Sequence, residues 1–287
     1  MEVHSPTSIA DAVGTLARYG GRAKVLAGGT DLVLDLKAGK AEPQALVWLG
    51  RIPGLTAIER EDGHLHLGAC VTATMLLESA LVREAALPLA LAAEAFGAPA
   101  SRDMATLGGN VVTASPAGDL SIALLALDAA AVLVGPQGRR RVPVGDLFAG
   151  PRRSAVAPEE LLVQFHIPVG DGRSGGDFVK LGPRQALAIS VVCAAATVTL
   201  GDGGTCAEAR IALGSVAPTP LRARGAEDIL RGRRPEGAVL DQAAERAAAE
   251  TNPISDIRGS AWYRRRVTPA LVRRALENAV ARAAGGR

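Results

Sequence analysis

The strongest indication of the fold comes from one stretch of sequence, Lys24-Val25-Leu26-Ala27-Gly28-Gly29-Thr30-Asp31-Leu32. A short apolar run followed by two glycines predicts a buried strand that ends in a tight loop. Glycines there permit positive φ angles and let a ligand approach the peptide N–H groups closely. Because converging N–H groups bind phosphate, we interpret this stretch as a candidate phosphate-binding loop.

A second stretch has the same pattern, Ala105-Thr106-Leu107-Gly108-Gly109-Asn110-Val111-Val112. Two such loops suit a ligand that carries two phosphates. Neither fits G-x-G-x-x-G or G-x-x-x-x-G-K-[ST], which disfavours a Rossmann dinucleotide fold and a P-loop nucleotide hydrolase. The alternative is that each glycine pair is an ordinary turn, since glycine is the default turn residue and the chain contains 33 of them.

Length and composition indicate a globular protein. The 287 residues allow one large domain or two to three smaller ones, and 48% of them are hydrophobic. The net charge is +3, with arginine clusters at 139–141 and 264–266. These clusters lack interleaved aromatic residues, so solvated faces or subunit contacts explain them better than nucleic-acid binding does.

The cysteines Cys70, Cys193 and Cys206 lie far apart in the sequence. Without a C-x-x-C pair, they cannot hold an iron–sulfur cluster alone. We expect a reducing cytoplasm, because there is no signal-peptide pattern and no apolar stretch reaches the roughly 18 residues of a membrane span. His64 and His66 share a strand face. A metal pair there is conceivable, but an exposed strand face is the better interpretation because no third ligand stands near.

The order of periodic segments predicts an α+β fold in three parts, which are residues 1–54, 55–168 and 177–287. The first part is a βαβ-like unit with strands at 23–27 and 45–49 and a helix at 32–37. The second part contains a hairpin at Asp62-Gly63, and a linker follows it at 168–176. Its other predicted elements are a helix from Thr72 through Leu81, a helix at 88–96, a helix at 120–127 and a strand at 161–167. The third part combines strands at 188–200 and 208–213 with helices at 223–231, 240–249 and 269–283.

Two later blocks extend the pattern, one at 212–222 (ALGSVAPTPLR) and one at 253–265 (PISDIRGSAWYRR). With the two glycine blocks, and in this order, they resemble the FAD-binding medium subunit of the molybdenum hydroxylases, the group of xanthine dehydrogenase and aerobic carbon monoxide dehydrogenase. The resemblance covers nearly the whole chain. It implies a two-part FAD-binding domain of the PCMH or vanillyl-alcohol-oxidase type, followed by a C-terminal domain of sheet and helices. Short motifs such as Gly150-Pro151 resemble the xanthine dehydrogenase group more than the carbon monoxide dehydrogenase group.

The resemblance also implies a role in electron transfer within a hetero-oligomer. A molybdopterin large subunit oxidises the substrate, and an iron–sulfur small subunit passes electrons singly to FAD, which then reduces NAD or another acceptor. This chain carries no cluster or molybdenum ligands, so by itself it has no catalytic or metal-binding residue to offer. The alternatives are a stand-alone flavin oxidase of the same superfold and a scaffold without cofactor. The histidines His4, His64, His66 and His166 lie outside the flavin blocks, which argues against covalent attachment, and both glycine pairs are intact.

The residues implied to bind FAD follow from the match. Two segments would bind the diphosphate through N–H groups and a hydroxyl, namely Val25, Leu26, Ala27, Gly28, Gly29, Thr30, Asp31, Leu32, Thr106, Leu107, Gly108, Gly109 and Asn110. Phe96 would lie by the flavin, Asp119 by the ribose or adenine, and Leu162 by the adenine or ring. Lys180 would lie at the pyrimidine edge, where a cation stabilises the anionic reduced flavin.

Each single position has a plainer interpretation. Phe96 could be a core residue at a helix end, Asp119 an N-cap, and Lys180 a solvated strand lysine. The segment 100–104 departs from the stretch richer in arginine and asparagine that many relatives have. That departure leaves the orientation of the second glycine segment open.

Overall fold

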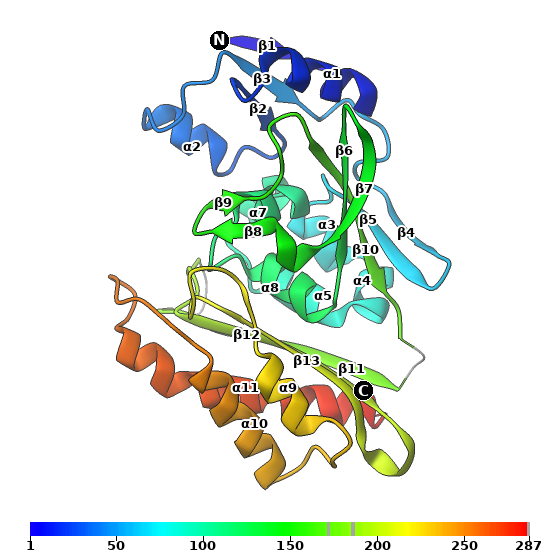
Figure 1. The fold of residues 1–287 in the computed structure, drawn as a ribbon, viewed down its shortest axis with the longest axis vertical. Helices are drawn as coiled ribbons and strands as arrows, with labels where there is room; N and C mark the ends of the chain where they lie inside the picture. The colour runs from blue at the N-terminus through cyan, green and yellow to red at the C-terminus, as the bar shows by residue number, and fades with distance from the viewer. Residues whose placement is uncertain (171–172, 185–186, 286–287) are drawn as a thin grey trace.

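The computed structural model describes residues 1–170, 173–184 and 187–285. Its N-terminal part is a parallel sheet in the order β1-β3-β2 (Figure 1). Ser8 caps the helix that covers this sheet by accepting from the Asp11 N–H, and Gly20 ends it in the left-handed conformation. The elements are β1 (Glu2–His4), α1 (Ile9–Tyr19), β2 (Ala23–Leu26), α2 (Leu32–Lys37) and β3 (Ala45–Trp48). The predicted βαβ-like unit is confirmed.

An antiparallel sheet in the order β4-β5-β10-β6-β7 forms the middle of the molecule (Figure 1). Helices α5 and α8 are apolar on nearly every face and lie in the main core beside it. The strands are β4 (Ile58–Glu61), β5 (His64–Gly68), β6 (Ala130–Gly135), β7 (Gly138–Pro143) and β10 (Leu161–Pro168), and β8 (Phe148–Gly150) pairs with β9 (Arg153–Ser154). The helices are α3 (Ala73–Glu78), α4 (Ala80–Ala85), α5 (Leu87–Glu94), α6 (Pro99–Met104), α7 (Leu107–Thr113), α8 (Asp119–Ala126) and η1 (Val144–Leu147).

The predicted single helix from Thr72 through Leu81 is wrong. Thr72 does cap α3, but the helix ends at Glu78. Ser79 has extended backbone angles, and its hydroxyl accepts from the Val82 N–H, so it begins α4. A serine that competes for backbone hydrogen bonds therefore divides the apolar run.

The C-terminal part is a sheet in the order β11-β12-β13-β14, backed by helices. Figure 1 shows this sheet between its own helices α9–α11 on one side and helices α5 and α8 of the middle part on the other. Its elements are β11 (Ser174–Leu181), β12 (Val192–Leu200), η2 (Asp202–Gly204), β13 (Cys206–Gly214), β14 (Leu221–Arg222), α9 (Arg224–Leu230), α10 (Ala238–Ala249) and α11 (Ala261–Ala283). The α+β fold is confirmed.

Three boundaries in this region differ from prediction. The segment 168–176 is not all linker, because β10 continues to Pro168 and β11 begins at Ser174; residues 171–172 lie outside the described residues. The strand expected from residue 188 begins only at Val192. The last helix begins at Ala261, where Ser260 caps it, and Pro269 lies inside it.

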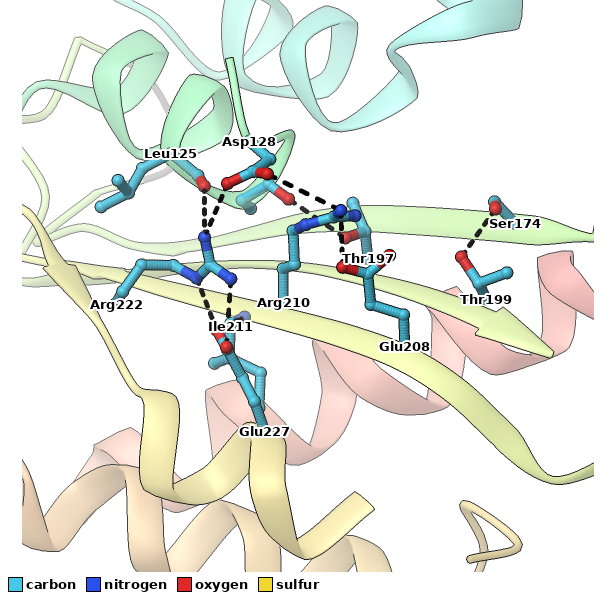
Figure 2. A network of polar contacts seen from close by, with 11 residues as sticks. Leu125, Asp128, Ser174, Thr197, Thr199, Glu208, Arg210, Ile211, Arg222 and Glu227 are labelled. Atoms are coloured by element: carbon cyan, nitrogen blue, oxygen red, sulfur yellow. Dashed lines mark hydrogen bonds and ion pairs between the residues drawn. The ribbon is translucent and has the colours of Figure 1, made fainter. Parts of the chain in front are cut away.

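Arg222 joins the C-terminal sheet to the middle part (Figure 2). Its guanidinium donates to both oxygens of Glu227, at 2.5 and 3.0 Å, and also to the Leu125 carbonyl and the Asp128 carboxylate. Arg210 lies 3.8 Å from the other carboxylate oxygen of Asp128. A planar guanidinium that satisfies several acceptors at once fixes how the end of α8 meets β13 and β14.

Candidate functional site

The first glycine pair lies where β2 ends, and it needs glycine for two separate reasons. A β-carbon on Gly28 would lie 1.6 Å from the Met104 carbonyl oxygen, and Gly29 has a φ of +75°. The loop therefore packs directly on the end of α6, immediately before the second glycine segment. Farther along, the Thr113 hydroxyl donates to the Asp31 carboxylate at 3.3 Å. The two glycine segments lie side by side.

The peptide N–H groups of this loop are available to a ligand. Among the residues that the structure describes, none accepts a hydrogen bond from the N–H groups of Gly28, Gly29, Thr30, Asp31 and Leu32. The first bonded donor is Val33, whose N–H reaches the Gly29 carbonyl at 3.0 Å. The loop residues are half-buried or exposed. A run of unpaired donors on a glycine turn suits an anion.

The β2 residues that precede the loop provide its support. Val25 and Leu26 pair with Val47 and Trp48 of β3, so β2 is the edge of its sheet. Val25 and Ala27 pack against the N-terminal core. The start of the loop is thus held in place by a strand of the N-terminal sheet.

The second glycine pair is not a loop, which corrects the prediction. Thr106 is the N-cap of α7, and the pair forms the first helical turn. Its N–H groups are used inside the protein: Leu107 donates to Val71 at 2.9 Å, Gly108 to Ala69 at 2.8 Å and Gly109 to the Thr106 hydroxyl at 3.1 Å. The small residues serve close packing, since a β-carbon on Gly108 would lie 2.8 Å from the Ala69 carbonyl oxygen.

Asn110 contributes the remaining polar group of this segment. Its Oδ1 accepts from the Ser121 N–H at 3.1 Å and from the Ser121 hydroxyl at 2.9 Å, which ties α7 to α8. No described residue accepts from its Nδ2. This side chain is therefore the donor that α7 can offer to a ligand.

Lys180 and Asp119 form an ion pair between β11 and the start of α8. The Lys180 ammonium donates to Asp119 Oδ2 at 2.6 Å and to the Ala95 carbonyl at 2.9 Å. Asp119 is only 4% exposed, and its Oδ1 accepts from the Ser190 hydroxyl at 2.6 Å. Both of its oxygens thus have partners within the protein, and its contact with the ribose or adenine of FAD stays a prediction. Asp119 is not the N-cap, which is Gly118.

The charges of this pair depend on each other. Burial raises the pKa of Asp119, while the Lys180 ammonium and the Ser190 hydroxyl act in the opposite direction. Lys180 is not a solvated lysine, because its side chain is 10% exposed. An ammonium has three N–H donors, and protein oxygens take two of them. One donor is left for a ligand.

Phe96 and Leu162 occupy core positions. Phe96 follows α5, is half-buried and packs against the main core, as the alternative interpretation expected. Leu162 is 4% exposed in β10 and belongs to the same core. Their contacts with a cofactor stay predictions.

Met104 and Ser190 are parts of the site that sequence reasoning missed. Met104 acts through its backbone carbonyl, for which the sequence contains no signal. Ser190 is a single hydroxyl beside the apolar residues Ile189 and Val191. Such an isolated polar residue next to a buried strand was a usable signal, because buried hydroxyls need partners.

A cluster of histidines lies elsewhere, on the middle sheet. His166 pairs in register with His66 of β5, and their ring centroids are 4.2 Å apart. The neighbouring cavity of about 310 Å³ is lined by His64, His166 and Arg141, among others, and by no residue of the glycine segments. In the described part of the chain, no group of three or more His, Cys, Asp or Glu residues could hold a metal ion.

Comparison with known proteins places this arrangement in a family. Residues 1–170 match the FAD binding domain in molybdopterin dehydrogenase, and residues 177–279 match the CO dehydrogenase flavoprotein C-terminal domain. The chain therefore belongs to the FAD-binding medium subunits of the molybdenum hydroxylases. It is an oxidoreductase subunit, and its cofactor is FAD.

Particular relatives align over nearly the full length. The carbon monoxide dehydrogenase medium chain of Afipia carboxidovorans is 38% identical, over 98% of this chain and 97% of that protein. The xanthine dehydrogenase FAD-binding subunit of Escherichia coli O157:H7 is 32% identical, over 99% and 97%. A solved carbon monoxide dehydrogenase from Hydrogenophaga pseudoflava superimposes with a TM-score of 0.94 at 34% identity, over 98% of each chain. These identities favour the carbon monoxide dehydrogenase group, contrary to the expectation drawn from Gly150-Pro151.

The lengths and polarity of the helices bear on whether the chain could cross a membrane. Within the described ranges, no helix combines the length and the apolar character that crossing a bilayer requires.

Proposed function

We propose that this chain holds FAD with its diphosphate on the loop at Gly28–Leu32 and its flavin near Lys180, and that it relays electrons through this cofactor. The observation that carries the proposal is the run of unpartnered N–H groups beside Met104. Peptide donors at a glycine turn bind two phosphates without requiring lysines. The Asn110 amide adds a donor from α7.

The residues near Lys180 fit the other end of the cofactor. Bound FAD accepts electrons one at a time and delivers two to an acceptor. Lys180 keeps one N–H for a ligand, and its positive charge favours the anionic reduced flavin. The buried Asp119 fixes where that charge lies. The protein thus positions the cofactor and adjusts its electrostatics, while the redox chemistry belongs to the flavin.

We further propose the partners and the route. The electron donor is the iron–sulfur small subunit of a complex that also contains a molybdopterin large subunit, and the acceptor is NAD or another oxidant. The support is that relatives of similar length are named as medium chains or subunits of such dehydrogenases. We also propose domains at 1–54, 55–168 and 177–287, and a reducing cytoplasmic location, which suits the free thiols of Cys70, Cys193 and Cys206.

A titration of the cofactor-free full chain with FAD and with FMN tests the binding mode. FMN carries the same flavin but one phosphate and no adenine. We expect FAD to bind at least tenfold more tightly and to stay non-covalent, so that acid precipitation releases it. Equal affinities for FAD and FMN would contradict a diphosphate on the glycine loop. Flavin that stays attached after acid precipitation would favour the stand-alone oxidase.

Co-expression of this chain with the proposed iron–sulfur small subunit and molybdopterin large subunit tests the electron-transfer route. We expect this chain to elute with an iron–sulfur protein and a molybdopterin protein, and its flavin to become reduced when the substrate of the complex is added. Elution as a separate yellow protein that oxidises a substrate alone would contradict the proposed role.

A further inference from the structure

Ser190 lies behind the Lys180–Asp119 pair, at the end of the connection between β11 and β12. It is 1% exposed, and its hydroxyl donates to Asp119 Oδ1 at 2.6 Å. The other carboxylate oxygen accepts from Lys180, also at 2.6 Å. The Asp119 carboxylate is thus held from both sides, by a cation and by a neutral hydroxyl.

The backbone of Ser190 is fixed by a second layer of buried polar groups. Its carbonyl accepts from the Ser215 hydroxyl at 2.9 Å, and the Ser215 carbonyl accepts from Arg264 at 2.8 Å. Arg264 also donates to the Val191 carbonyl at 2.8 Å and pairs with Asp256 at 2.6 Å. Arg264 is 3% exposed, so this support is buried rather than solvated.

The consequence for Lys180 follows from the geometry. A carboxylate held at both oxygens cannot rotate, so it fixes the ammonium against the Ala95 carbonyl and leaves the third N–H in one direction. Without the Ser190 hydroxyl, Oδ1 would lose its 2.6 Å donor in a site that is 4% exposed, and besides Lys180 only the weak S–H donor of Cys193, among the described residues, would remain beside the carboxylate. Burial already raises the pKa of Asp119, so losing the donor favours its protonated form. The Lys180 ammonium would then keep its positive charge beside an Asp119 carboxyl group that neutralises it less.

We infer that Ser190 is a positioning residue that aligns Asp119 and thereby sets how much of the Lys180 charge acts on bound FAD. This inference rests on the proposed FAD site. It concerns a residue that contacts no reacting atom and acts only through its carboxylate neighbour.

The test compares Ser190→Ala with Ser215→Ala in the FAD-loaded full chain. Ser215 is a matched control, because it is another buried hydroxyl of the same network and reaches only the Ser190 carbonyl. The measurement is the midpoint potential of the flavin, followed by absorbance during a reductive titration. We expect Ser190→Ala to shift the potential to more positive values, and Ser215→Ala, which leaves the Ser190 hydroxyl in place, to shift it by less than half as much. Equal shifts in both variants would overturn the inference.

A double-mutant cycle with Lys180→Gln separates charge from packing. We expect the Ser190→Ala shift to fall at least fivefold when Lys180 is replaced, and an undiminished shift would overturn the inference. Ser190→Thr and Ser190→Val form a second pair of nearly equal shape, so the test does not depend on how well the alanine variant folds. The threonine variant should keep the wild-type potential and the valine variant should not; identical potentials would refute the role of the hydroxyl. Wild-type protein that refuses FAD would refute the proposed function instead.

Discussion

A β-carbon on Gly28 would lie 1.6 Å from the carbonyl oxygen of Met104, so these two residues bring the first glycine loop against the end of α6. Any side chain at Gly28 must push two backbone segments apart. We expect Gly28→Ala to weaken FAD binding at least tenfold, because the free N–H groups would no longer converge. Fluorescence titration of the cofactor-free protein measures this.

Gly14→Ala is the control for that change. Gly14 lies inside α1, and a β-carbon there would meet nothing within 4 Å. Alanine in a helix should stabilise the fold by about 0.5–1 kcal/mol and leave FAD affinity unchanged. An equal loss of FAD in both variants would mean that the glycine loop is not the binding element.

Arg222 should matter for stability more than exposed arginines do. Arg222→Ala leaves the Glu227 carboxylate buried without its cation, although the Ile211 N–H still donates to it at 2.8 Å. Removing one partner of a buried pair costs about 3–5 kcal/mol. Urea denaturation monitored by circular dichroism measures it. The matched control is Arg231→Ala, which breaks an exposed pair with Asp228 and should cost less than about 1 kcal/mol.

The cap of α7 supplies a smaller prediction. Thr106→Ala removes the hydroxyl that accepts from the Gly109 N–H, and the loss of an N-cap costs about 1 kcal/mol. Chemical denaturation should show this decrease, while Thr113→Ala at the other end of the same helix should cost about half as much or less. The reverse order would contradict the assignment of Thr106 as the cap.

His166 predicts a loss of stability in mild acid. Burial, together with neighbouring His66, Arg141 and Arg139, lowers the pKa of His166 from 6.5 to about 4. Between these pH values this histidine binds a proton in the unfolded chain but not in the folded protein. The free energy of unfolding therefore falls as pH decreases from about 6.5 to about 4. His166→Asn should lose less melting temperature over this range than wild type. Parallel melting curves for the two proteins would contradict the shift.

Much of the local structure follows from residues close in sequence. The strand and glycine turn at 23–29, the helix at 32–37 and the hairpin at Asp62-Gly63 depend on apolar periodicity and on residues that tolerate positive φ, as the values of +48° and +73° at the hairpin illustrate. The second glycine pair has the same letters but a different outcome. Its peptide groups find partners on the 69–71 segment and start a helix, which no local rule reveals.

The family of this chain could be inferred from its sequence, because the ordered blocks of glycines, prolines and arginines resemble those of one family. The short elements that obey local rules could be inferred in the same way. Which polar groups act together depends on the folded chain. Lys180 meets Asp119 across 61 residues, and Ser190 reaches the same carboxylate across 71. The physical reason is that a buried charge is stable only with partners around it, and the folded chain, rather than sequence spacing, brings those partners to it.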